Sequence, residues 1–173
     1  MIGRIIAMAA LAASAPAWGH IVFTEPEGQA GAYYAGFLRV SHGCGDSATI
    51  SLRVEIPETL LTVRPQPKPG WTLVIERVPL ARPMPGEGGA LIRERVSAVT
   101  WTGELPADQF DQFGLMMKLP DTPGALYFPA VQICAEGRNE WTAVPADPAK
   151  WHELETPAPI LTIRPAQAEH AMH

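Results

Sequence analysis

Basic residues are scarce in this sequence, which has 13 Lys and Arg against 18 Asp and Glu and a formal net charge of −5. That balance argues against nucleic acid as a partner, because phosphate backbones bind basic surfaces. Long hydrophobic runs are also missing: the run over residues 5–13 is shorter than the roughly 20 residues of a membrane-spanning helix. We therefore expect no stable membrane insertion. Glycine-rich phosphate loops, HExxH and CxxC motifs and a recognisable Ser, His and Asp arrangement are absent too, which leaves no evident catalytic motif.

Residues 1–19 have the pattern of a secretory signal peptide. Arg4 supplies the positive charge, residues 5–13 the apolar segment, and residues 15–19 the small-residue stretch before a cut. Cleavage after Gly19 would make His20 the first residue, and cleavage after Ala17 would leave Trp18 there; composition does not choose between them. The expected location is the periplasm or the outside of the cell, with 12 basic and 18 acidic residues left in the mature chain.

Cysteine is limited to two residues, Cys44 and Cys134. Export places them in a compartment that permits disulfides, so we expect one bridge between them. Closing the loop of about 90 residues between them would stabilise the fold by about 4 kcal/mol in the chain-entropy model. The alternative is a pair of thiolate metal ligands.

Short apolar and β-branched runs recur between turn signals, and several alternate with period two. They predict about eight strands and a single-domain, all-β antiparallel sandwich over residues 20–165, followed by a flexible tail, 166–173. Residues 65–71 and 79–89, rich in Pro and Gly, are predicted to be loops. The predicted strands cover residues 21–23, 37–40, 50–56, 72–75, 96–101, 113–119, 125–133 and 160–163.

His20 is the most informative single residue, because of its position. As the first residue of a mature chain, it would offer its α-amine and its Nδ1 to one metal ion, and two neutral nitrogens suit Cu(II) better than harder cations. If cleavage follows Ala17 instead, His20 is an ordinary histidine at a strand edge.

Several segments between His20 and about Pro145 resemble the YcnI-like family, also known as the DUF1775 domain. The pairing of a PKPGW loop with a VTWTG strand is the most specific part of this resemblance. The segments are FLRVSHGC at 37–44, Ile56-Pro57, PKPGW at 67–71, VTWTG at 99–103, FDQF at 110–113 and Glu140-Trp141.

The resemblance implies a sandwich similar to an immunoglobulin or fibronectin domain that binds Cu(II) through a monohistidine brace, with His20 supplying amine and imidazole. Members of the Gram-positive type complete the site with a glutamate and place a tryptophan, matched here by Trp141, beside the metal. The sequence departs from that pattern at residues 41–44, which read SHGC without a glutamate. His42 is the favoured replacement ligand; the alternative is a loop histidine that hydrogen-bonds to the backbone beside Cys44.

Other donors are weaker candidates. Glu25 and Glu27 could supply the missing carboxylate, although residues 24–28 resemble a turn with solvated charges. His170, Met172 and His173 form a soft-donor cluster in the tail that could capture copper a second time. Met116 and Met117 are adjacent on a predicted strand, so only one of them can face the core, and they are minor Cu(I) candidates.

The leading hypothesis is an exported copper-binding protein, not an enzyme, that exchanges Cu(II) with a membrane copper transporter or a copper chaperone. A histidine-brace copper monooxygenase is the second hypothesis, because a site of His20 and His42 would have the same ligands. A metal-free immunoglobulin-like module that binds a partner protein is the third.

Overall fold

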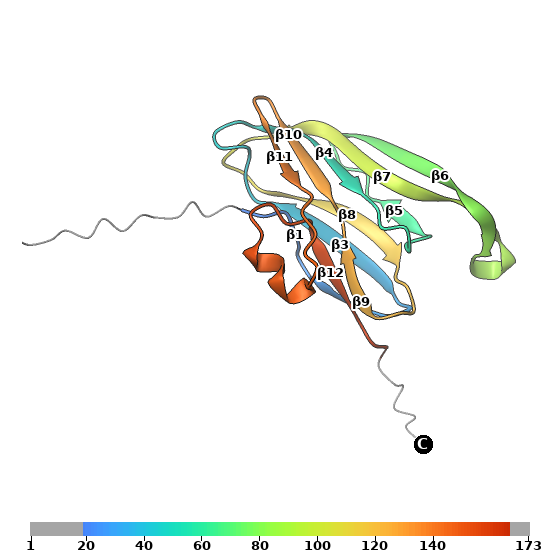
Figure 1. Cartoon of the computed structure of the whole chain (residues 1–173). Helices are drawn as coiled ribbons and strands as arrows, with labels where there is room; N and C mark the ends of the chain where they lie inside the picture. The colour runs from blue at the N-terminus through green and yellow to red at the C-terminus, as the bar shows by residue number, and fades with distance from the viewer. Residues whose placement is uncertain (1–18, 167–173) are drawn as a thin grey trace, which may run out of the picture.

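The structure is a computed structural model that describes residues 19–166 of the chain (Figure 1). The predicted signal peptide, apart from Gly19, and the predicted tail after residue 166 lie outside the described residues. Within them the chain is all-β, interrupted by two short 3-10 helices, η1 (Glu87–Gly89) and η2 (Pro148–Glu153). Neither is long and apolar enough to cross a membrane.

Strands make up most of the described chain. In chain order they are β1 (Val22–Phe23), β2 (Glu27–Gln29), β3 (Tyr33–Val40), β4 (Thr49–Glu55), β5 (Val63–Pro65), β6 (Thr72–Pro85), β7 (Leu91–Leu105), β8 (Asp111–Lys118), β9 (Gly124–Tyr127), β10 (Ala130–Cys134), β11 (Arg138–Trp141) and β12 (Ile160–Arg164).

These strands form three sheets. One has four strands in the order β1-β3-β8-β5, a second has five in the order β11-β10-β4-β7-β6, and a third has three in the order β2-β12-β9. Among the pairings between the strands of residues 19–166 only β12 with β2 is parallel; the other strand pairs are antiparallel. The two larger sheets lie in separate layers (Figure 1). The predicted antiparallel sandwich is therefore confirmed.

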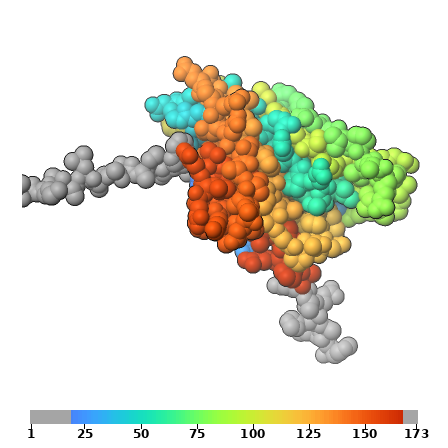
Figure 2. All heavy atoms as spheres, viewed as in Figure 1, coloured from blue at the N-terminus to red at the C-terminus, as the bar shows by residue number. Residues whose placement is uncertain are grey.

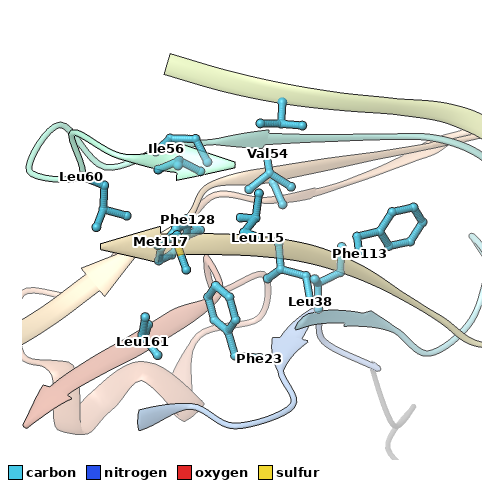
Figure 3. Close-up of a cluster of buried hydrophobic side chains, with 14 of the residues drawn as sticks. Phe23, Leu38, Val54, Ile56, Leu60, Phe113, Leu115, Met117, Phe128 and Leu161 are labelled. Carbon is cyan, nitrogen blue, oxygen red and sulfur yellow. The ribbon is translucent and has the colours of Figure 1, made fainter. Parts of the chain in front are cut away.

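The core lies between these layers and follows from the period-two alternation of the strands. Leu38 from β3, Leu52 from β4 and Trp101 from β7 have no exposed surface, while their strand neighbours point outward. Figure 3 shows Leu38, Val54 and Leu115 converging from different strands. Each such side chain contributes about 1.5–3 kcal/mol by leaving water.

Two of the sequence predictions, one of a loop and one of a strand, were wrong. Residues 79–85, expected to be a loop, are the distal half of β6, and the turn is confined to residues 86–90. Proline is tolerated there because β6 is an edge strand whose ladder shifts register between Pro79 and Met84. The resulting β6–β7 hairpin forms one end of the molecule (green in Figure 2). Residues 125–133, expected to be one strand, divide at Phe128-Pro129 into β9 and β10, which belong to different sheets.

Candidate metal centre

His20 lies two residues before Val22, where β1 begins, and the pairing of Val22 with Arg39 of β3 fixes the direction of the chain at this end. The half-buried His20 side chain packs against two indole rings, each in a T-shaped arrangement. Its ring centroid is 5.7 Å from that of Trp141 and 5.6 Å from that of Trp151. Trp141, the predicted neighbour, is therefore beside His20, together with Trp151, which no sequence pattern had indicated.

His42 lies two residues after β3 and turns its ring toward the start of the described chain. Its Nε2 accepts a hydrogen bond from the main-chain N–H of Gly19 at 3.0 Å. Its Nδ1 is 2.5 Å from the main-chain oxygen of Gly43, which can only accept, so Nδ1 carries the proton. The lone pair of Nε2 consequently points at the residue that precedes His20.

The turn after His42 holds this ring in place. Gly43 is required there because a Cβ on it would lie 2.0 Å from the main-chain oxygen of Ser47. The predicted disulfide between Cys44 and Cys134 is present, with 6.0 Å between the Cα atoms, and joins the turn to the end of β10. A main-chain bond from Cys44 N to Ser47 O at 3.0 Å closes the turn. The two cysteines are thus bonded to each other and are not thiolate ligands.

Gln132 on β10 links the two parts of the site from inside the protein. It is 1% exposed, and its Nε2 donates to the main-chain oxygen of His42 at 2.8 Å and to Thr49 Oγ1 at 2.7 Å. Its Oε1 accepts from the indole N–H of Trp141 and from Asn139 Nδ2, each at 3.3 Å. One buried amide therefore sets the position of the His42 backbone relative to the Trp141 ring.

The comparison with known proteins places the whole sandwich in one family. Residues 20–163 match the family described as "Domain of unknown function (DUF1775)". The chain belongs to the DUF1775 family. A solved structure described as "Crystal structure of an uncharacterized protein from Nocardia farcinica reveals an immunoglobulin-like fold" is similar to it, with 28% identity and a TM-score of 0.61 over 83% of this chain and 97% of that one. No curated protein matches. This DUF1775 domain thus has the immunoglobulin-like fold that its sequence resemblance implied.

The carboxylates proposed as further ligands in this DUF1775 domain have other surroundings. Glu27, on β2, forms an ion pair with Arg164 that lowers the pKa of its carboxyl group. Glu25 is exposed, and its main-chain oxygen accepts a hydrogen bond from the hydroxyl of Tyr34. Within residues 19–166, no three His, Cys, Asp or Glu side chains form a group that could hold a metal ion. No described carboxylate therefore completes a three-residue group with His20 and His42.

The remaining candidate ligands are two methionines on β8 and the donor cluster of the tail. Met117 is fully buried and Met116 is 41% exposed, so the prediction that the two point to opposite faces of β8 is confirmed. His170, Met172 and His173 lie outside the described residues.

Trp151 belongs to η2, between β11 and β12. Asp147 begins this 3-10 helix by accepting a hydrogen bond from the N–H of Ala149 at 3.0 Å, with Pro148 following it as the first residue. The Asp-Pro pair was a visible helix-start signal, but nothing in the sequence indicated which residue Trp151 would contact.

Proposed function

We propose that this protein is exported, that its mature chain begins at His20, and that it holds one Cu(II) ion at that terminus. In this proposal the α-amine and imidazole of His20 bind the ion together with Nε2 of His42. The observation that carries it is the hydrogen bond from Gly19 N to His42 Nε2, because it puts an imidazole lone pair next to the predicted cut. Removing Gly19 would free that lone pair.

The donor chemistry suits copper. Two imidazoles and an amine are neutral nitrogen ligands, which favour Cu(II) over oxygen-seeking cations such as Mg²⁺ and Ca²⁺. Metal-bound histidines usually donate their second ring N–H to a carbonyl or carboxylate, which fixes the tautomer. The Nδ1 of His42 has that arrangement toward Gly43 O. Bound copper would supply a Lewis-acidic, redox-active ion to the site.

The proposed role is binding and transfer, with a membrane copper transporter or a copper chaperone as the partner. Trp141 has no exposed surface and packs against the His20 ring, which would restrict further ligands on that side. Restricted access favours holding the ion over turning over a substrate. We therefore propose a function in copper trafficking and homeostasis, in the periplasm or outside the cell, without enzymatic activity.

The test is a native mass spectrum of the protein exported by its own type of host, with one equivalent and then an excess of Cu(II). We expect a mature mass that begins at His20 and one copper that survives desalting. His20→Ala and His42→Ala should each weaken Cu(II) binding by about 100-fold or more, since ligands matter at least as much as the residues that orient them. His152→Ala, at an exposed position on η2, is the matched control and should bind as the wild type does. A mature chain beginning at another residue would contradict the proposal.

A further inference from the structure

The His20 ring has two indole neighbours that differ in exposure. Trp141 is fully buried, whereas Trp151 is partly exposed. Both indoles form T-shaped pairs with the imidazole, with interplanar angles of 74° and 79°. Trp141 therefore lies on the core side of His20, and Trp151 is the aromatic neighbour that faces solvent.

Trp151 is held in that position by its own hydrogen bond. Its indole N–H donates to the main-chain oxygen of Ala158 at 2.6 Å. Ala158 is itself fixed, because its N–H donates to Ala143 O at 2.8 Å, and the main chain pairs again where Ala143 bridges Pro157. Figure 1 shows η2, which carries Trp151, beside the point where the described chain begins. The ring is thus anchored to Ala158, and Ala158 is in turn held by Ala143 at the other end of the segment.

An ion bound at His20 would depend on this ring for shielding. A Cu(II) ion held by the nitrogen donors of His20 and His42 would still have room for outside ligands. A chelator or a small anion that approached the His20 ring from the side of Trp151 would meet this partly exposed indole first.

We propose that Trp151 is the outer wall of the His20 site, and that it limits the access of exogenous ligands and slows the release of copper. This inference rests on the proposed function where copper is concerned. The part of the inference that concerns shielding of the His20 imidazole by Trp151 applies to the metal-free protein as well.

The experiment compares Trp151→Ala, Trp151→Phe and His152→Ala with the wild type, all as mature chains that begin at His20. Trp151→Phe keeps an aromatic ring beside His20 but removes the hydrogen bond to Ala158. Two quantities are measured: the rate at which diethyl pyrocarbonate modifies His20 in the metal-free protein, located by peptide mass spectrometry, and the rate at which bound Cu(II) passes to excess EDTA. Circular dichroism verifies that each variant is folded.

We expect Trp151→Ala to raise both rates about three- to tenfold, Trp151→Phe to stay within about twofold, and His152→Ala to match the wild type. Unchanged rates in folded Trp151→Ala would overturn the proposal. So would equal effects of Trp151→Phe and Trp151→Ala, since the hydrogen bond rather than the ring would then matter. A wild type that holds no copper contradicts the proposed function alone, because the modification rate of His20 still tests the wall.

Discussion

Replacing Gln132 by leucine removes the amide that joins His42 to Trp141 and keeps a side chain of similar size in the core. The substitution leaves the indole N–H of Trp141 without a partner and takes from the Thr49 hydroxyl its bond to Gln132, so that only the 4.0 Å contact with Cys134 Sγ remains. Trp141 and Thr49 are both fully buried. The main-chain oxygen of His42, which is half-buried, loses its bond as well.

The expected loss follows from those two buried groups. A buried polar group left without a partner costs about 1–3 kcal/mol, and each further hydrogen bond lost, at Thr49 and at His42, costs about 0.5–1.5 kcal/mol, so Gln132→Leu should lower the free energy of unfolding by about 2–5 kcal/mol. Because a domain of this kind is stable by about 5–15 kcal/mol in total, the variant should still fold. The leucine fills the space of the amide, so little of the loss should come from a cavity.

The assay is equilibrium unfolding in urea, followed by tryptophan fluorescence, with the disulfide intact. Gln109→Leu is the control, because Gln109 is exposed and the change there should stay within about 0.5 kcal/mol. Similar midpoints for Gln132→Leu and Gln109→Leu would refute the argument that the buried amide holds the site together.

Three further predictions concern other parts of the structure. Replacing Cys44 and Cys134 together by serine opens a loop with a sequence separation of 90 and should cost about 4 kcal/mol, measured by urea unfolding; unchanged stability would contradict this. Gly43→Ala places a methyl group against the main-chain oxygen of Ser47, so the substitution should lower the melting temperature. It should also weaken Cu(II) binding in a calorimetric titration, and an affinity equal to that of the wild type would argue against a precise turn at His42. Burial raises the pKa of Tyr34 to about 12. The stability that its neutral form contributes is therefore present below the unfolded pKa near 10 and is lost as the pH rises toward 12. Ultraviolet titration of the wild type against Tyr34→Phe measures the pKa of this tyrosine, and a value near 10 would refute the prediction.

The strands of the sandwich were readable because burial alternates with the sequence. Leu38 and Val40 are buried and Arg39 is exposed, as the period-two pattern of residues 37–40 predicts. The pairing of Cys44 with Cys134 needed only their number and the expectation of export.

Features that depend on tertiary context were not readable. Prolines normally end a strand, and the edge position of β6 that tolerates residues 79–85 is a property of the assembled sheet. Gln132 looks like any polar strand residue, and its role depends on Trp141 and His42 reaching it from two other segments. The role of Trp151 could not be read from the sequence for the same reason, because Trp151 and His20 lie far apart in the chain and meet only in the folded protein.

The central claim, that His20 and His42 bind one Cu(II) ion together, is tested most directly by electron paramagnetic resonance. The sample is the mature chain beginning at His20 with one equivalent of Cu(II), compared with His42→Ala and His20→Ala. The account predicts nitrogen hyperfine structure from three donors in the wild type and from one fewer in each variant. A spectrum that is the same in all three proteins would place copper elsewhere and contradict the account.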